Sequence, residues 1–373
     1  MVYFDNSATT KVCEKAAKKA LYLMTENFGN PSSVHSLGVD AEFEMENARK
    51  IIAKRLSCTP SEITFTSCGT EANNLAIFGA IEKNKRLGKK IVTTAVEHPS
   101  VINAMKHLEN EGYEVIYLPV DKNGCVSEKD IENAVDKNTI LVSIMLVNNE
   151  SGAIMPVKSA KDAIVKNNSP ALLHCDCVQG FGKIHFTPAA LGADLISISG
   201  HKVHAPKGIG ALYIKKGVKI VPQMLGGGQE KGLRSGTEAV ALIGAFGEAV
   251  KELPSVDIAE KHIKNLNDRL REGVKEIDGF FINSGENASP YILNVSTEKI
   301  PSEVMIRFLE SKGIFVSGGS ACSKGARSHV LSAQGVSPKR IDCAIRISMC
   351  YGNTMEEVEL LLEAIKESLN LVR

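Results

Sequence analysis

The hydrophobic residues of the chain show two patterns that alternate along most of the sequence. In stretches such as 17–28 and 41–56, apolar residues recur three or four positions apart, a spacing typical of an amphipathic helix. Short apolar runs such as 140–147 and 191–198 lie between these stretches, and runs of this length are typical of buried strands. Because strands that alternate with helices favour a helix-covered parallel sheet, the sequence predicts an α/β fold with a mostly parallel central sheet.

The pattern changes after Pro254, where a Pro-Ser pair interrupts the helical spacing. Beyond it a long helix is expected around 258–277, followed by strands and shorter helices in a mixed order. We therefore expect two domains, a large one formed by residues 13–254 and a smaller α+β domain formed by residues 1–12 and 255–373.

Polar side chains follow four of the expected strands, at the point where each strand ends. These segments are Glu97-His98, Asn148-Asn149-Glu150, residues 176–179 and residues 199–202. Sheets of this class bind ligands in the crevice at the carboxyl ends of their strands. Loops after strands are often polar simply because they face solvent. All four polar segments lie at strand ends, however, and this common position predicts one shared site.

Lys202 is the candidate centre of that site. It follows a buried strand within Ser199-Gly200-His201-Lys202, and a lysine that loses hydration there can act as an amine nucleophile and form a Schiff base. The neighbouring serine and histidine are suited to holding an anionic group such as phosphate. Taken alone, a solvated loop lysine is the commoner explanation of such a motif.

A second candidate for anion binding is Gly69-Thr70, between a short strand and a helix. The first N–H groups of a helix have no internal partners and lie at the positive end of its dipole, which favours an anion. Glycine and threonine are also plain helix-capping residues, so the motif is weak by itself. Elsewhere the glycine-rich segment 226–236 lacks the Gly-x-Gly-x-x-Gly spacing of a dinucleotide site.

Cys322 is the one cysteine that lies in a run of small, flexible residues. Free cysteine usually packs as a small buried hydrophobe, but glycines and serines on both sides of Cys322 favour exposure. Nearby Lys324 and Arg327 favour the thiolate over the thiol. We therefore interpret Cys322 as a candidate nucleophile on the smaller domain.

The composition bears on which partners the protein binds and on where in the cell it is expected. The 373 residues carry 44 basic and 43 acidic side chains, which gives no reason to expect a nucleic acid or a membrane surface as partner. No apolar stretch reaches the length of a membrane span, and nine scattered cysteines suit reduced thiols, so a cytoplasmic location is expected. We expect no metal site. Cys175 and Cys177 are expected to lie on opposite faces of a strand, so that one metal ion would not readily bind both thiols.

Taken together, these segments resemble the cysteine desulfurases, the NifS/IscS-like branch of the fold-type I pyridoxal phosphate enzymes, which are related to the class V aminotransferases. The resemblance covers nearly the whole chain. In chain order, the matching motifs lie at residues 3–10, 28–33, 69–71, 97–98, 147–150, 176–179, 199–202, 234–237, 320–322 and 345–348. Three places depart from the usual family pattern: Cys68, residues 348–354 and residues 323–330.

The resemblance implies a set of cofactor-binding residues. Lys202 would carry pyridoxal phosphate, and Asp176 would keep the pyridine nitrogen protonated so that the ring serves as an electron sink. His98 would stack on the ring. The remaining residues fall into two groups: Gln179 and Asn149 toward the phenolic oxygen, and Gly69, Thr70, Ser199, Gly200 and His201 at the phosphate. Thr237 would reach the phosphate of a second subunit, which implies a homodimer.

The resemblance also implies the reaction. Arg346 would hold the carboxylate of L-cysteine, because the planar guanidinium is a bidentate donor that suits a carboxylate. Asn30 and Asn149 would lie close by. The catalytic residues would be Lys202, His98 and Cys322, with Cys322 taking the sulfur as a persulfide and alanine as the product. The sulfur would then pass to an acceptor protein of an iron–sulfur cluster or thiolation pathway.

Several alternatives stay open from the sequence. Within the same fold the chain is compatible with a selenocysteine lyase, a cysteine sulfinate desulfinase or an aminotransferase, although an aminotransferase has no need of Cys322. A sulfur-relay or assembly partner with weak turnover is a further possibility. A metal-binding redox protein is disfavoured by the spacing of the cysteines.

Overall fold

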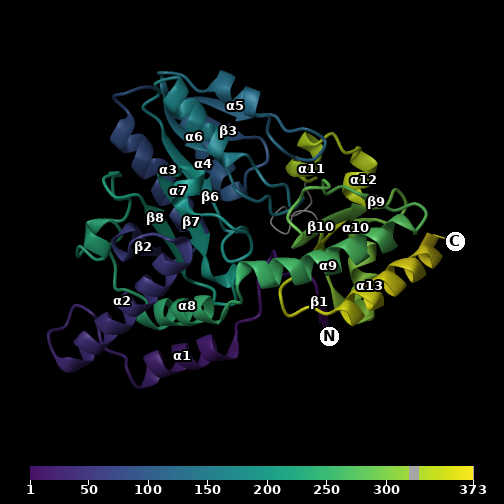
Figure 1. The fold of residues 1–373 in the computed structure, drawn as a ribbon, viewed down its shortest axis with the longest axis horizontal. Helices are drawn as coiled ribbons and strands as arrows, with labels where there is room; N and C mark the ends of the chain where they lie inside the picture. Colours follow the sequence, from purple (N-terminus) through teal and green to yellow (C-terminus); the bar gives the residue numbers. More distant parts are fainter. Residues whose placement is uncertain (319–326, 373) are drawn as a thin grey trace.

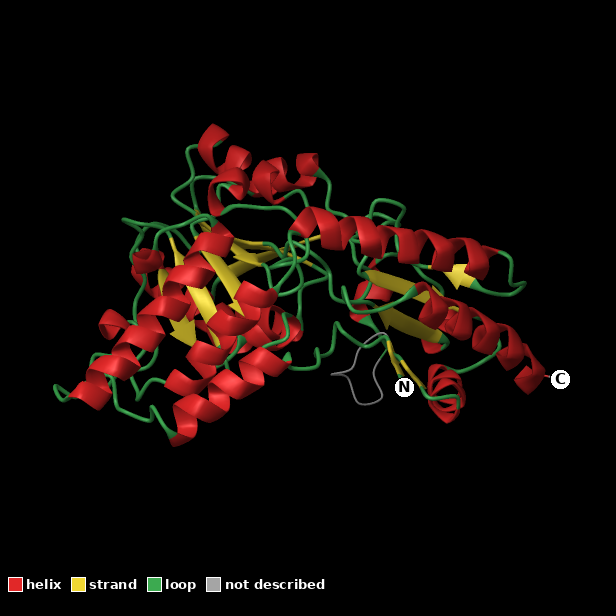
Figure 2. Ribbon diagram, turned by 60° about the horizontal axis from the view of Figure 1, so that its bottom comes forward, coloured by secondary structure: helices red, strands yellow, loops and turns green. Residues whose placement is uncertain are grey.

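The computed structural model describes residues 1–318 and 327–372 of the chain. Two groups of strands, each with helices beside it, form a larger and a smaller body (Figure 1, Figure 2). Both chain termini lie on the smaller body (Figure 1). Among the described helices, none is long and apolar enough to cross a membrane.

The larger body is built on a seven-stranded sheet. Its strands β7, β6, β5, β3 and β4 are parallel, whereas β8 is antiparallel to both of its neighbours, β2 and β7. The predicted mostly parallel central sheet is therefore confirmed. In spatial order the strands are β2 (Ile63–Thr66), β8 (Gly210–Ile214), β7 (Leu195–Ser199), β6 (Leu172–Asp176), β5 (Thr139–Ser143), β3 (Lys90–Thr94) and β4 (Glu114–Leu118).

Helices bury both faces of this sheet because neighbouring strand residues point to opposite sides. Ile91 belongs to the apolar cluster that contains residues of α3 and α4, whereas the adjacent Val92 belongs to the cluster on the other side, which includes residues of α6 and α8. The helices of the larger body are α1 (Glu14–Thr25), α2 (Ser36–Leu56), α3 (Gly69–Asn84), α4 (Pro99–Asn110), α5 (Glu128–Ala134), α6 (Val157–Lys166), α7 (Pro188–Leu191) and α8 (Val240–Glu252).

The smaller body has an antiparallel sheet with helices beside it (Figure 2). Its strands are, in spatial order, β12 (Ser317–Gly318), β13 (Ala344–Ser348), β10 (Ile292–Ser296) and β9 (Phe281–Ile282). Its helices are α9 (Val256–Lys275), α10 (Ser302–Ser311), α11 (His329–Ala333), α12 (Pro338–Asp342) and α13 (Met355–Ser368). Short 3-10 turns are formed by Pro60–Glu62, Gly200–Lys202, Glu230–Gly232 and Leu369–Val372.

The first residues of the chain join the two bodies. Strand β1 (Val2–Tyr3) pairs in parallel with β11 (Ile314–Phe315) of the smaller body. A few residues later, the Thr10 N–H donates to the carbonyl of His201 in the larger body at 2.9 Å. The N-terminal segment therefore spans the region between the bodies, while the boundaries at residues 12 and 254 stay a prediction.

Helix α1 leaves two of its larger apolar side chains exposed. Its buried face consists of Ala16, Ala20 and Leu23. By contrast, Leu21 and Met24, which follow the helical spacing in the sequence, are 62% and 56% exposed. The described part of the chain thus leaves an apolar helix face open to another surface.

Candidate active site

A pocket lies at the carboxyl ends of the parallel strands and collects residues that are far apart in the sequence. Such a crevice is the expected ligand site of an α/β sheet. Its lining includes Arg346 from β13 of the smaller body. From the larger body and the N-terminal segment come Ser7, Ala8, Cys68, Gly69, Thr70, Asn73, His98, Pro99, Ser100, Met145, Val147, Asn149, Glu150, Asp176, Val178, Gln179, Ser199, His201 and Lys202.

Lys202 reaches this pocket from the 3-10 turn that follows β7. Its Nζ donates hydrogen bonds to the carbonyl oxygens of Ser7 and Ala8, the latter at 2.8 Å. The amine is thereby directed at the N-terminal segment from the edge of the central sheet. An amine in this position is suited to forming a Schiff base with an aldehyde in the pocket.

Asp176 is the last residue of β6 and is buried at the floor of the pocket. Its Oδ2 accepts a hydrogen bond from Asn73 Nδ2 at 2.8 Å, and its Oδ1 accepts one from the Val178 N–H at 2.9 Å. These two hydrogen bonds fix the orientation of the carboxylate. The arrangement suits a carboxylate that pairs with a protonated ring nitrogen.

His98 caps the start of α4, where its Nδ1 accepts a hydrogen bond from the Ser100 N–H at 3.1 Å. Burial lowers the pKa of His98, while the nearby Asp176 carboxylate opposes that shift. The ring is therefore held in one orientation and favours the neutral form. His98 lines the pocket, where a flat ligand ring can stack on the face of the imidazole.

The opposite end of the pocket is built to receive an anion. Gly69 begins the 16-residue helix α3, and a Cβ added there would approach Val178 Cγ2 to 2.8 Å. Ser199 Oγ is buried beside it without a hydrogen-bond partner among the described residues. A helix N-terminus with an orphaned hydroxyl fits a phosphate group. With Lys202 and Asp176 in the same pocket, the residues present fit pyridoxal phosphate.

Two further residues of the Ser-Gly-His-Lys motif have different surroundings. Burial lowers the pKa of His201 to about 4, so its ring is neutral at physiological pH. Gly200 is buried behind the pocket, and a Cβ added to it would approach Ile209 Cγ2 to 2.7 Å. Gly200 is therefore required for close packing under the lysine.

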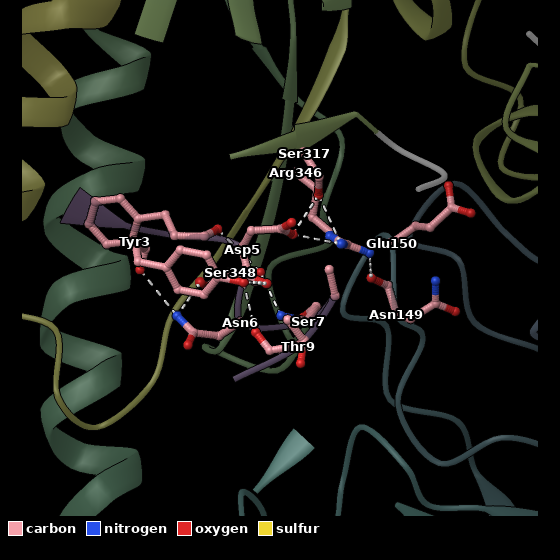
Figure 3. Close-up of polar contacts among 12 residues, drawn as sticks. Tyr3, Asp5, Asn6, Ser7, Thr9, Asn149, Glu150, Ser317, Arg346 and Ser348 are labelled. Carbon is pink, nitrogen blue, oxygen red and sulfur yellow. Dashed lines mark hydrogen bonds and ion pairs between the residues drawn. The ribbon is translucent and has the colours of Figure 1, made fainter. Parts of the chain in front are cut away.

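Arg346 is buried where the two bodies meet, with 3% of its side chain exposed. Its Nη2 donates to Asp5 Oδ1 at 2.9 Å and to Ser317 Oγ at 2.8 Å, and its Nη1 donates to the Asn149 carbonyl at 2.9 Å (Figure 3). Its Nε is buried without an acceptor among the described residues. This unused donor makes Arg346 suitable for a carboxylate ligand.

Within the described part of the chain, Asn30 and Thr237 are two predicted site residues that the fold does not bring to the pocket. Asn30 is exposed in the loop between α1 and α2, where its Oδ1 accepts a hydrogen bond from the Ser32 N–H at 2.9 Å. Thr237 is also exposed and lies outside the pocket lining. Cys322 lies outside the described residues.

The pocket also contains residues that sequence reasoning did not assign. The Ser7 and Ala8 carbonyls hold Lys202, Asn73 holds Asp176, and Glu150 accepts a hydrogen bond from Ser328 Oγ. Asn73 lies one helical turn after Gly69, so helical spacing alone offered a signal for it. The backbone carbonyls gave no signal, because any residue type supplies them.

The interpretation of Cys175 and Cys177 was wrong. Their sulfurs lie 3.5 Å apart, because residues two positions apart in an extended segment point to the same side. Both thiols are fully buried, and burial raises the pKa of each. Even so, the described residues contain no group of three or more His, Cys, Asp or Glu side chains suited to a metal ion.

The chain is similar to known proteins over almost its whole length. The profile of the family described as aminotransferase class V matches residues 2–361. A cysteine desulfurase IscS from Methanosarcina thermophila is 42% identical over 377 residues, covering 100% of this chain and 93% of the relative. A cysteine desulfurase IscS 1 from Archaeoglobus fulgidus is 40% identical, covering 98% and 96%.

Solved structures give the same result. A structure described as a NifS-like protein superposes with a TM-score of 0.94 at 41% identity, covering 99% of both chains. A structure described as SspA in complex with cysteine has a TM-score of 0.84 at 34% identity, covering 95% of this chain and 100% of the other.

Proposed function

The chain belongs to the class V aminotransferase family and to its pyridoxal phosphate-dependent cysteine desulfurases, and we propose that Lys202, Arg346 and Cys322 together release sulfur from L-cysteine. The main support for the residue roles is a shared pocket. Lys202, Asp176 and Arg346 come from three separate strands or turns and line the same cavity. They supply an amine, a carboxylate and a carboxylate-binding guanidinium for one amino-acid substrate.

The pocket residues divide the work of holding the cofactor. Lys202 would bind the aldehyde carbon, Asp176 would keep the pyridine nitrogen protonated, and His98 would lie against the ring. Gly69 and Ser199 would hold the phosphate, with Thr70 and His201 beside them. When bound, pyridoxal phosphate supplies an electron sink for the bonds at the substrate α-carbon.

The protein's own residues then carry out the reaction. Arg346 binds the substrate carboxylate, with Asn149 beside it, and the Lys202 amine moves protons at the substrate carbons. The Cys322 thiolate attacks the substrate sulfur, so that a sulfur–sulfur bond forms and the carbon–sulfur bond breaks, leaving its electron pair on carbon. Protonation of that carbon gives alanine, and the sulfur stays on Cys322 as a persulfide.

A single substitution tests the role of Cys322. Cys322→Ser should take up pyridoxal phosphate with a normal visible spectrum, yet form no persulfide and no alanine from L-cysteine. Cys343→Ser is the matched control, because Cys343 is a buried thiol of the same body that lies outside the pocket. A Cys322→Ser enzyme that desulfurates cysteine at the wild-type rate would refute the assignment.

A second copy of the chain completes the site in this proposal. Thr237 is exposed and outside the pocket of its own chain, and α1 leaves Leu21 and Met24 exposed. Both features support a homodimer in which Thr237 reaches the phosphate of the other subunit. Thr237→Val should weaken cofactor binding in the dimer, which equilibrium dialysis measures. Unchanged affinity in a confirmed dimer would exclude this contact.

The fate of the sulfur follows from the same proposal. A persulfide on Cys322 can pass to a protein thiol, so an acceptor of an iron–sulfur cluster or thiolation pathway is the expected partner. A cytoplasmic location is proposed with it. The cysteines of the described segments support both, because none of them is paired in a disulfide.

A further inference from the structure

Lys183 is a buried lysine beside the active site that the proposed reaction does not use. The residue is only 6% exposed, and burial lowers the pKa of its amine to about 8. Among the residues that the structure describes, no carboxylate forms an ion pair with it. Burying a lysine without such a partner is energetically costly, so the burial of Lys183 needs a structural explanation.

The reason lies in its contact with Gln179, which lines the pocket. The segment after β6 forms a helical turn, in which the Phe181 N–H donates to the Cys177 carbonyl at 2.8 Å and the Ile184 N–H to the Gly180 carbonyl at 3.1 Å. Residues four positions apart share a face of such a turn. Lys183 Nζ thereby donates to Gln179 Oε1 at 3.0 Å.

This contact decides which way the Gln179 amide points. A lysine ammonium has donors and no acceptor, so it accommodates only the oxygen of the amide. The amide nitrogen then faces the other way, where Nε2 donates to the Ser7 carbonyl at 3.0 Å. The same carbonyl accepts a hydrogen bond from Lys202 Nζ.

The amide also gains donor strength from Lys183. Gln179 Nε2 carries two hydrogens, and the Ser7 carbonyl accepts only one of them. A cation bound to the amide oxygen polarises the amide, which strengthens its N–H groups as donors. Gln179 therefore presents a polarised N–H at the pocket wall.

Other titratable groups around Lys183 belong to the smaller body and to residues 201–204. The charge of Arg346 lowers the pKa of Lys183 further, while the Cys350 thiol opposes that shift. The Tyr291 ring lies 5.9 Å from Nζ. The charge of Lys183 in turn lowers the pKa of His201 and of His204.

We propose that Lys183 is a positioning residue that fixes Gln179 as a polarised hydrogen-bond donor toward the phenolic oxygen of pyridoxal phosphate. The inference rests on the proposed function and on the role that the family resemblance implies for Gln179, which is to lie toward that oxygen. A stronger donor there stabilises the anionic phenolate. Lys183 thereby lowers the pH at which the bound cofactor loses its proton, without touching cofactor or substrate.

The test compares Lys183→Met with Lys183→Arg in the holoenzyme. Methionine fills the same space without charge or donor, and removing a desolvated charge leaves folding intact. The pH midpoint of the cofactor's visible absorption should rise by about one unit in Lys183→Met. Lys183→Arg should restore most of the wild-type value. Lys207→Met is the matched control, because Lys207 is exposed, lies near the site and does not contact Gln179.

A second measurement does not need the cofactor. In the apoprotein, the rate at which an amine-acylating reagent modifies Lys202 is followed against pH by mass spectrometry. The Gln179 N–H and the Lys202 amine both donate to the Ser7 carbonyl, and without the Lys183 charge the Gln179 N–H competes less strongly for it. The Ser7 carbonyl then stabilises the Lys202 ammonium better, so the pH midpoint of Lys202 acylation should rise by about half a unit in Lys183→Met. The Lys207→Met control should leave it in place.

The outcomes separate this inference from the proposed function. Wild-type midpoints in Lys183→Met, in both the absorption and the acylation measurements, would overturn the positioning role. A shift that Lys207→Met reproduces would also overturn it, since it would reflect only the loss of a nearby charge. A wild-type protein that binds no pyridoxal phosphate would refute the proposed function, while the acylation measurement would still decide the role of Lys183.

Discussion

Arg346 and Asp5 are 341 positions apart in the chain, yet Arg346 Nη2 donates to Asp5 Oδ1 at 2.9 Å. The pair balances part of the arginine charge in a buried place, where an unpaired guanidinium is costly. The Nε–H of the same guanidinium keeps no acceptor in the described structure. One edge of Arg346 is thus held by the N-terminal segment, and a donor is left over for the carboxylate of a substrate.

The first prediction concerns this arginine. Arg346→Lys should lower kcat/KM for L-cysteine by about a hundredfold, because a point charge replaces a planar guanidinium whose Nε–H is left for the substrate carboxylate. The cofactor spectrum should stay unchanged. Arg269→Lys is the control, since Arg269 is an arginine that pairs with a carboxylate, that of Glu359, outside the pocket. Equal losses in both variants, measured as alanine production, would contradict the assignment.

The second prediction uses two serines of β7. Ser199 Oγ is buried and has no hydrogen-bond partner within residues 1–318 and 327–372, whereas Ser197 Oγ lies 3.0 Å from His174 Nε2. Ser199→Ala should leave the apoprotein as stable as the wild type or more stable, because a buried unpaired hydroxyl costs about 1–3 kcal/mol. It should also weaken pyridoxal phosphate binding about tenfold, as the lost hydrogen bond to an anion implies.

Ser197→Ala should behave in the opposite way. It breaks a satisfied hydrogen bond and should destabilise the protein by about 1 kcal/mol. Its cofactor affinity should remain near the wild-type value, because Ser197 does not line the pocket. Thermal denaturation and equilibrium dialysis measure the two properties, and a Ser199→Ala variant with full cofactor affinity would remove Ser199 from the phosphate site.

The third prediction is a dependence of stability on pH. Glu97 is fully buried, and this burial raises its pKa to about 8, above the value of about 4.3 for an exposed glutamate. The folded state therefore favours the protonated form. The resulting stability is complete below about pH 4 and is lost as pH rises through about 8, so wild-type stability should fall by about 2 kcal/mol between pH 6 and pH 8.

Glu97→Gln should flatten this dependence, since the amide keeps an acceptor for Thr94 and Met145 and does not titrate. Urea denaturation at several pH values measures the difference. Part of the slope should remain, because burial also raises the pKa of Glu150, to about 7. An unchanged slope in Glu97→Gln would show that Glu97 is charged in the folded protein at neutral pH.

The fourth prediction concerns Ser328, which caps α11 and also donates to Glu150 Oε2. Ser328→Ala should destabilise the protein by about 1–2 kcal/mol, since it removes a helix cap and leaves a buried carboxyl without its donor. In a double-mutant cycle with Glu150→Ala, the two effects should not add, and the coupling should be about 1 kcal/mol. Additive effects in urea denaturation would mean that the hydrogen bond contributes nothing to stability.

Local patterns in the sequence predicted the central sheet and most of the pocket. Apolar runs and helical spacing reflect which side chains must leave water, and this requirement is local to each strand or helix. The polar residues after β3, β5, β6 and β7 meet at one edge because parallel strands end together. Asp176, Ser199 and Lys202 were therefore found from position and residue type.

Contacts between distant segments were settled only by the tertiary structure. Periodicity gave α1 an apolar face that the described segments do not cover. It gave no sign that Lys183 donates to Gln179 or that the Ser7 carbonyl holds Lys202. Residue type determines what a side chain is able to donate or accept. Which partner it meets depends on how the two bodies and the N-terminal segment pack, because a hydrogen bond requires two atoms within about 3 Å whatever their separation along the chain.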